Sequence, residues 1–192
     1  MQPLTMTRRA TLAAALGPLV SPLPMAKVNL GVTTDEIDED VAVAAGFLQE
    51  FKLQWAEVRN IWGKYNTAQP VDRVKDARAI LDKHGIRTSI LATGFFKIPL
   101  PPDTPEGRAV LDNQWSLLEG AFERAKVFGT DKLRIFAFTH GKGETPDERH
   151  YPRIHELVTE AARGAANSGA CGWRLKMLAI ATCGQARKRR RF

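Results

Sequence analysis

Two residues with side chains that can exchange protons stand where strands are predicted to end. Glu57 lies near the end of the run 53–59, and His140 follows the run 133–138 in a glycine-rich loop. A carboxylate or an imidazole of tuned pKa is a general acid or base. Each also has a structural interpretation, because Glu57 can form a salt bridge with Arg59 and an isolated loop histidine often has no chemical role. Glu57 and His140 are the candidate catalytic residues.

The candidate binding residues are polar or aromatic and follow the same predicted strands. We expect Arg59 and Asn60 to bind hydroxyl or phosphate groups, with capping of the loop as the equal alternative. Trp62 can stack on a sugar ring or cover the end of a strand. Phe96 can line a site or pack in the core, and Lys97 can reach a phosphate or stay solvated.

Arg134 is unusual because it lies inside an apolar run, 133–138. Arginine is rarely buried without a partner. Its position therefore indicates either an anion anchor in a site, the interpretation that we favour slightly, or one half of a buried ion pair.

Alternating strands and helices must position these residues. Strand patterns cover 28–32, 53–59, 86–93 and 133–138, and apolar residues at helical spacing cover 41–48, 70–84, 107–128 and 152–166. Four consecutive strand–helix units require parallel strands, in either an open doubly wound sheet or a barrel. No GxGxxG or GxxxxGK[ST] motif follows a strand, so the main signal of a nucleotide-binding sheet is missing.

Four segments resemble the opening of the xylose isomerase-like TIM-barrel family. They are 30–36 (LGVTTDE), 55–64 (WAEVRNIWGK), 84–87 (HGIR) and 93–100 (TGFFKIPL). This family includes sugar phosphate isomerases and epimerases and is similar to the type 2 AP endonucleases. The resemblance covers 27–169 and implies an α/β fold, a partial (β/α)8 TIM barrel of about four βα units with parallel strands.

The same resemblance implies a metal-dependent proton transfer on a sugar or sugar phosphate. In this family a divalent cation (Mn²⁺, Mg²⁺ or Co²⁺) holds two sugar oxygens, and two glutamates move a proton beside a carbonyl. The family's ligands are Glu, Asp, His and Glu at the ends of strands five to eight. No acidic residue follows Glu160, so we expect no metal site in this chain. The chain then corresponds to a truncated N-terminal half, and its activity as an isomerase or epimerase on its own is in question.

Two other functions fit the sequence. A half barrel leaves open sheet edges, so the chain can instead be a sugar-binding protein or a homodimer of half barrels. Nucleic-acid binding through the basic end of the chain ranks last, because no aromatic residue interleaves with the basic run 188–191.

The net charge of +7 arises at the end of the chain. Residues 161–192 hold eight basic residues and no acidic one, which leaves 20 basic against 21 acidic residues in 1–160. Residues 170–192 are predicted to be a basic, aberrant or disordered tail in place of a fifth strand. A shift of reading frame near Lys176 would explain this, because the shifted codons would give a Glu-Asn pair that resembles the family's fifth strand end.

The first 26 residues read as a targeting segment. The sequence Thr7-Arg8-Arg9-Ala10-Thr11-Leu12 resembles a twin-arginine export signal, and an Ala/Leu-rich stretch follows it. We expect export to the periplasm or medium if this segment is used, and a cytoplasmic protein otherwise. No apolar run is long enough to span a bilayer. The two cysteines have no neighbouring Cys/His cluster, which argues against zinc.

Overall fold

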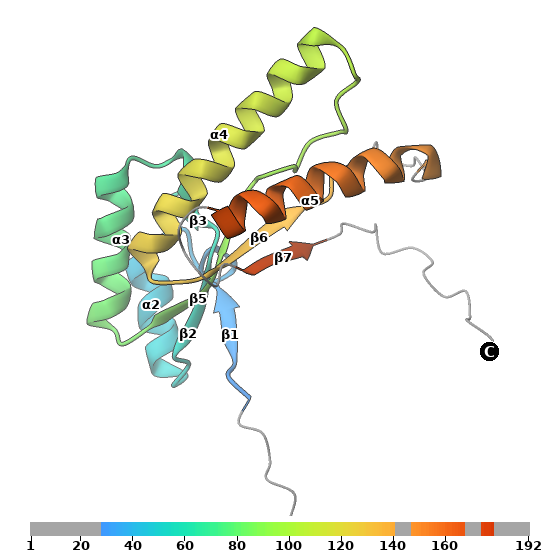
Figure 1. Ribbon diagram of the computed structural model, residues 1–192. Helices are drawn as coiled ribbons and strands as arrows, with labels where there is room; N and C mark the ends of the chain where they lie inside the picture. Colours follow the sequence, from blue (N-terminus) through green and yellow to red (C-terminus); the bar gives the residue numbers. More distant parts are fainter. Residues whose placement is uncertain (1–27, 141–146, 168–173, 179–192) are drawn as a thin grey trace, which may run out of the picture.

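The centre of the molecule is a parallel β-sheet. The computed structural model describes residues 28–140, 147–167 and 174–178. Its main sheet has five strands in the order β1-β2-β5-β6-β7, which is also their order along the chain (Figure 1). The strands are β1 (Gly31–Thr33), β2 (Trp55–Val58), β5 (Arg87–Ala92), β6 (Lys132–Phe136) and β7 (Arg174–Leu178).

The strand order distinguishes the two predicted architectures. A doubly wound sheet reverses its strand order part-way, whereas a barrel adds each strand beside the previous one. Here every neighbouring pair is parallel and no reversal occurs. The described residues therefore form part of a (β/α)8 barrel. The barrel is not closed, because β1 and β7 are both edge strands in the part of the chain that the structure describes.

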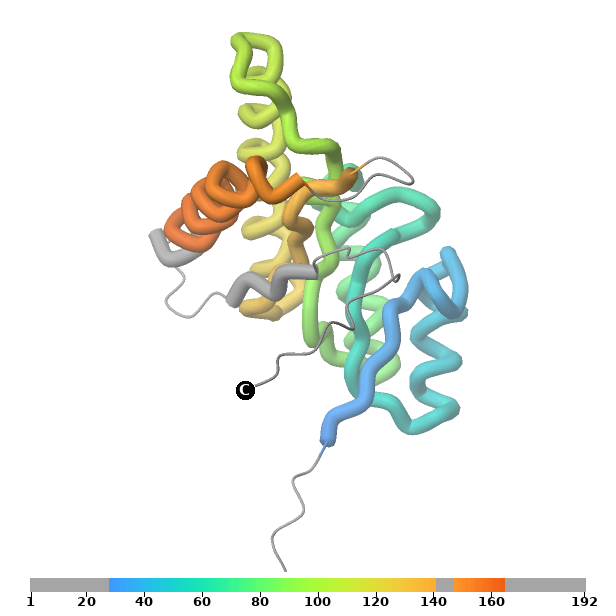
Figure 2. The backbone as a smooth tube through the Cα atoms, turned by 90° about the vertical axis from the view of Figure 1, so that its right-hand side faces the viewer, coloured from blue at the N-terminus to red at the C-terminus, as the bar shows by residue number. Residues whose placement is uncertain are grey.

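The helices cover one face of this sheet. They are α2 (Val41–Glu50), α3 (Val71–Lys83), α4 (Pro105–Phe128) and α5 (Tyr151–Asn167). The backbone view shows the helix layer beside the strands (Figure 2). Alternate strand residues such as Ala56, Val58, Leu133 and Ile135 are buried in one continuous apolar core, which includes side chains of all four helices. The residues between them face the other side, where no helix lies among the described residues.

Helix ends follow the capping chemistry of the sequence. Asp40 caps α2 by accepting a hydrogen bond from the backbone of Ala42, and Thr104 caps α4 in the same way through Gly107. Gly129 ends α4 with a left-handed backbone (φ 67°), a conformation that suits glycine. In the described residues, no helix combines the length and hydropathy that a membrane span needs.

A small hairpin follows β2 and was not predicted. It joins β3 (Asn60–Ile61) to β4 (Lys64–Tyr65) in an antiparallel pair, with Gly63 in the turn at φ 77°. A short 3-10 helix, η2 (Asn66–Ala68), leads from the hairpin to α3. Strands of two residues are too short to show an alternating pattern, so the sequence carries no periodic signal for them.

The fifth strand corrects one expectation. Residues 170–192 were predicted to break the strand–helix pattern, but β7 pairs in parallel with β6 over its whole length, from Lys132↔Arg174 to Phe136↔Leu178. The basic residues at 174 and 176 misled the prediction, although they alternate with leucine and methionine as in a strand. Backbone hydrogen bonds to an open edge form whatever the charge of the side chains. The predicted export segment, 1–26, and the rest of the tail lie outside the described residues.

Candidate functional site

An ion pair between Glu57 and Arg134 spans the face of the sheet that no described helix covers. The Nη2 atom of Arg134 lies 2.8 Å from the Oε1 atom of Glu57, and each side chain is only about one-sixth exposed (16% and 17%). Glu57 comes from β2 and Arg134 from β6, so the pair bridges over β5, which lies between them. Arg134 aligns with Ala92, the last residue of β5. The pair is therefore close to the carboxyl ends of the strands, where TIM barrels place their sites.

The pair leaves hydrogen-bonding atoms unused. The Oε1 atom of Glu57 and the Nε atom of Arg134 are buried, yet neither makes a hydrogen bond. The close approach of Nη2 to Oε1 thus brings opposite charges together without the directed geometry of a hydrogen bond. Buried polar atoms that lack a partner are costly and are common at functional sites. A hydroxyl group of a ligand can both accept from Arg134 and donate to Glu57.

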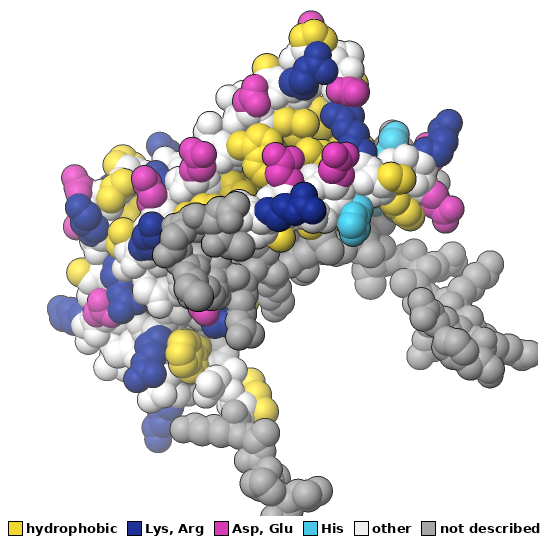
Figure 3. Space-filling model, viewed as in Figure 1, with side chains coloured by type: hydrophobic (Ala, Val, Ile, Leu, Met, Phe, Trp, Pro, Cys, Tyr) yellow, Lys and Arg dark blue, Asp and Glu magenta, His cyan; other side chains and the backbone are white. Residues whose placement is uncertain are grey.

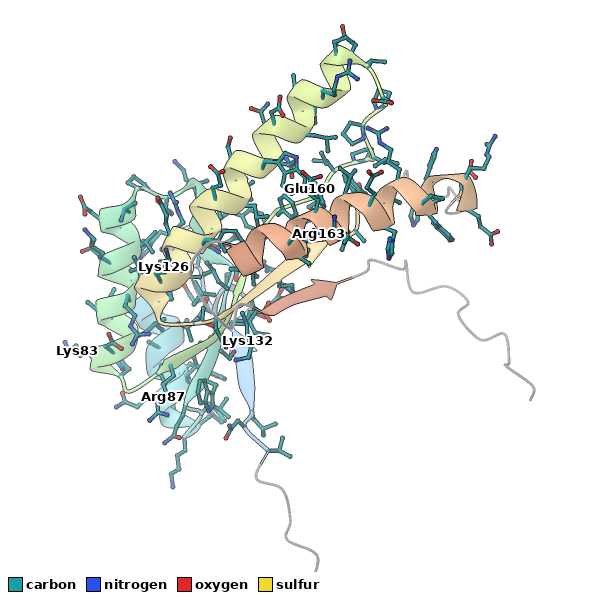
Figure 4. The ribbon with its side chains drawn as sticks, in the orientation of Figure 1. Lys83, Arg87, Lys126, Lys132, Glu160 and Arg163 are labelled. Carbon is teal, nitrogen blue, oxygen red and sulfur yellow. The ribbon has the colours of Figure 1, made fainter. Side chains whose placement is uncertain are left out.

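A hollow of about 430 Å³ lies on the same face of the sheet. Its lining lies toward the amino ends of the strands and mixes polar and apolar residues: Asn29, Gly31, Val32, Thr33, Trp55, Glu57, Ser89, Ile90 and Lys132. Figure 4 labels Lys132 at the start of β6, and its Nζ atom forms an ion pair with Asp131 at 2.8 Å. The interior of a closed TIM barrel is normally filled by branched apolar side chains. This hollow instead offers Glu57, Ser89 and Lys132 to the polar groups of a ligand, and Trp55 to an apolar face of it.

Arg59 and Asn60 hold the loop after β1 against the end of β2. The guanidinium of Arg59 forms ion pairs at 2.7 Å with Asp35 and with Glu36. Burial alone would lower the pKa of Arg59, but the hydrogen bonds and charges of Asp35 and Glu36 together raise it above its usual value. Asp35 also accepts a hydrogen bond from the backbone N–H of Asn60. The structural alternative for Glu57, a salt bridge with Arg59, is not found among the described residues, because Arg59 pairs with Asp35 and Glu36 and Glu57 pairs with Arg134.

Trp62 and Lys97 lie in the loops after β2 and β5. The guanidinium carbon of Arg73 is 3.8 Å from the centre of the Trp62 ring, so one face of that ring is already covered. The ammonium of Lys97 donates a hydrogen bond to the hydroxyl of Tyr65 at 3.1 Å and is exposed. Lys97 therefore remains accessible to an anion, whereas only the other face of Trp62 can meet a ligand.

Phe96 is part of the core and does not line a site. It is fully buried, and its ring stacks on Phe95 and on Phe138 with centroids 3.8 Å and 4.2 Å apart. Its predicted role as a substrate-binding residue is thus corrected. Phe96 and Phe138 both have a left-handed backbone (φ 58° and 66°), which is uncommon for bulky residues. This conformation turns two loop aromatics inward, and no sequence pattern shows it.

His140 lies just after β6, beside the parallel bridge that joins Thr139 to Pro99. It is partly buried, and it stands at the same end of the sheet as Arg59 and Lys97. The residues that follow it, 141–146, are outside the described part of the chain. The structure therefore brings Glu57 and Arg134 together. Five other candidates follow the carboxyl ends of β2, β5 and β6, namely Arg59, Asn60, Trp62, Lys97 and His140.

Asn66 is a polar residue of this region that the sequence analysis did not select. It is fully buried, and its amide donates hydrogen bonds to the carbonyl oxygens of Val58, Arg59 and Ala92. These carbonyls stand at the ends of β2 and β5, so Asn66 fixes the two strand ends to each other. Its only signal in the sequence is an asparagine between two predicted elements, which is more typical of a turn.

Several solved structures have a fold similar to that of this chain. A xylose isomerase domain protein from Planctomyces limnophilus matches 78% of this chain with 17% identity and a TM-score of 0.52. D-psicose 3-epimerase with D-tagatose, from Clostridium cellulolyticum, matches 77% with 13% identity and a TM-score of 0.56. A Thermus thermophilus protein soaked with ZnCl₂ matches 79% with 21% identity and a TM-score of 0.52. The shares of these three chains that are covered are 53%, 51% and 55%, respectively.

This chain has about half of a xylose isomerase-like TIM-barrel fold. The fold that the sequence predicted is thereby confirmed, and the chain spans about half the length of the solved structures it matches. No protein-family model matches the sequence, and no curated protein does.

The xylose isomerase-like half barrel does not offer the ligand set of a divalent cation among its described residues. They contain no group of three or more His, Cys, Asp or Glu side chains placed to hold a metal ion. The carboxylate of Glu57 faces the cationic Arg134 at 2.8 Å, which would repel a metal ion bound there. The described residues therefore do not fit the divalent cation that the resemblance implies.

Proposed function

We propose that this half barrel binds a sugar or sugar phosphate on the open face of its sheet, between the ion pair of Glu57 and Arg134 and the amino ends of the strands. The observation that carries the proposal is the ion pair of Glu57 and Arg134, in which Oε1 of Glu57 and Nε of Arg134 lack hydrogen-bond partners, beside a hollow with both polar and aromatic side chains. A sugar offers adjacent hydroxyl groups, each of which can both donate and accept a hydrogen bond. Trp55 adds an aromatic ring to the lining of the hollow. The fold supports this choice, because D-psicose 3-epimerase with D-tagatose is among the similar structures.

Turnover as an isomerase or epimerase is not part of the proposal for the chain alone. Proton transfer beside a carbonyl needs a base, an acid and stabilisation of the charge that develops. The described residues supply one carboxylate, Glu57, with Arg134 beside it, and no metal-binding cluster. Binding is thus the activity that this chain can carry by itself, and isomerase or epimerase chemistry would require the carboxylates of another half barrel. Export through residues 1–26 remains a separate proposal.

Titration calorimetry with D-tagatose and D-fructose tests the binding proposal. We expect the wild-type chain to bind at least one of them, and Glu57→Gln to weaken binding about tenfold, since the charged acceptor becomes a neutral amide. Glu156→Gln, on the exposed surface of α5, is the matched control and should bind like the wild type. Binding should be the same with Mn²⁺ as with a chelator. Equal binding by Glu57→Gln and the wild type, or no binding of either sugar, would contradict the proposed site.

A further inference from the structure

Helix α2 has no charged side chain over most of its length. From Val41 to Gln49 every residue is apolar, glycine or uncharged, and the first charge is Glu50 at the end of the helix. A surface helix normally carries charged residues on its solvent side. In contrast, Figure 3 shows acidic and basic side chains along the outer surface of the molecule where α4 and α5 lie. A helix that is apolar all round is usually covered on more than one side.

Three large apolar residues line the outer side of α2. Val43, Phe47 and Phe51 recur at four-residue spacing and are 54%, 40% and 59% exposed, respectively. The rings of Phe47 and Phe51 stack with their centroids 4.5 Å apart, so they form one continuous apolar surface. Scattered exposed apolar residues are ordinary, but a contiguous stripe of them indicates an interaction surface.

The stripe lies on the flank of α2 that no other described helix covers. Gln49, on the opposite flank, accepts a hydrogen bond at 2.8 Å from the Nδ1 atom of His84 at the end of α3. Phe47 is two residues from Gln49, which is about 200° around the helix, so it points away from α3. Figure 2 shows α2 at the edge of the helix layer, next to β1.

The free edge of the sheet continues the same surface. β1 pairs only with β2 among the described strands, so its other side is open. Val28 and Leu30, just before β1, are largely exposed and alternate with Asn29 and Gly31, which line the hollow. Because α2 runs antiparallel to β1, its end at Phe51 lies at this same end of the sheet.

We propose that a second copy of this chain covers this surface, with the same residues of both copies meeting around a two-fold axis. We call it the α2–β1 surface: Val28, Leu30, Val43, Phe47 and Phe51. An isologous contact requires a surface that complements itself, as an uncharged apolar surface does. The charged residues at its rim, Glu50 and Lys52, are one of each sign, so two copies do not repel each other. A two-fold axis would also set the β1 edges side by side in antiparallel order.

The alternative pairing, which closes a barrel from two chains, is less favourable. It would cover the open face of the sheet and remove from water the ammonium of Lys132 and the remaining exposed parts of Glu57 and Arg134. Burial of charged groups costs several kcal/mol per ion when the pairing is imperfect. The α2–β1 surface buries no charge, and it leaves the hollow open to a ligand. The two proposals therefore fail independently, since a dimer through this surface does not affect the sugar site.

Sedimentation velocity of the full chain over a range of concentrations tests this inference. We expect the wild type to sediment as a discrete dimer, and Phe51→Glu or Val43→Glu to shift it to the monomer, with at least a tenfold weaker dimer affinity. Val110→Asp is the matched control, because Val110 is also an exposed apolar residue (42%) but lies on α4. Circular dichroism should be the same for all four proteins, which shows that the variants fold.

Several outcomes would overturn the inference. If the wild type stays monomeric at all concentrations, no second copy covers the α2–β1 surface. A dimer that survives both glutamate variants must use another surface, and a dimer lost in Val110→Asp alone would place the contact on α4. If Phe51→Glu does not fold, Val43→Glu alone tests the inference. Val43 is exposed and, unlike Phe51, is not part of the stacked pair of rings, so its replacement should not disturb the fold.

Discussion

Glu57 and Arg134 meet across a strand that separates them, and this geometry sets what each residue can do. Two neighbouring strands lie about 4.8 Å apart, so only long side chains can reach over β5. The guanidinium of Arg134 fixes the position of the Glu57 carboxylate. One buried acceptor, Oε1 of Glu57, and one buried donor, Nε of Arg134, have no hydrogen-bond partner, so they favour a ligand whose groups both donate and accept hydrogen bonds. Arg134 was correctly singled out from the sequence because it interrupts an apolar run. Glu57 was singled out because it ends a strand, but its pairing with Arg134 was not predicted, because that pairing depends on the register of β2, β5 and β6.

Removal of Arg134 should destabilise the fold. Arg134→Met keeps most of the apolar stem but leaves Glu57 largely buried without its ion-pair partner. We expect a loss of about 1–3 kcal/mol in the free energy of unfolding. Arg108→Met is the control, because the ion pair of Arg108 with Asp103 is exposed and should contribute less than about 0.5 kcal/mol. Urea denaturation measures both. The double variant Glu57→Gln/Arg134→Met should recover part of the loss, and an equal loss in the two single arginine variants would contradict a role for burial.

Among the elements, the four helices and the first four strands of the main sheet were predicted, whereas the hairpin strands, the 3-10 helices and β7 were not. The helices α3, α4 and α5 and the strands β2, β5 and β6 have periodic apolar residues that their burial confirms. The hairpin β3–β4 and the 3-10 helices are too short to carry a period, and tertiary contacts hold them. The left-handed backbone at Phe96 and Phe138 likewise depends on packing between loops. The sequence can therefore name the loops that hold the site, but not the direction of their side chains.

Asn66 ties two such elements together, so its amide should matter more than that of an exposed asparagine. Asn66→Ala removes the donors to the carbonyls of Val58, Arg59 and Ala92, and these buried oxygens would lose a partner. We expect a loss of about 2–3 kcal/mol in the free energy of unfolding. Asn113→Ala, on the exposed side of α4, should change it by less than about 0.5 kcal/mol. Chemical denaturation followed by tryptophan fluorescence compares them, and similar values for both variants would show that the strand ends are fixed by other contacts.

At the scale of the whole molecule, the order of the strands in the main sheet identifies the fold. Both the doubly wound sheet and the barrel satisfied the sequence pattern, since each is made of the same strand–helix units. The absence of a reversal among the five described strands separates them. The same order leaves β1 and β7 as edges and puts β5 between β2 and β6. Stability should therefore be distributed unevenly across the sheet, with the greatest protection at its centre.

Hydrogen exchange should show this gradient directly. Amides of β5 are held between two strands and under the helix layer, so they should exchange only when the whole domain opens, whereas those of the edge strand β7 should exchange through local opening. Strand β1 reports on the second copy: its amides should be slower in the wild-type dimer than in monomeric Phe51→Glu, while β5 stays equally slow in both. Mass spectrometry of peptic peptides measures these rates. Equal rates in β5 and β7 would mean that the sheet opens as one unit, and a β1 rate unaffected by Phe51→Glu would mean that this edge is not at the contact.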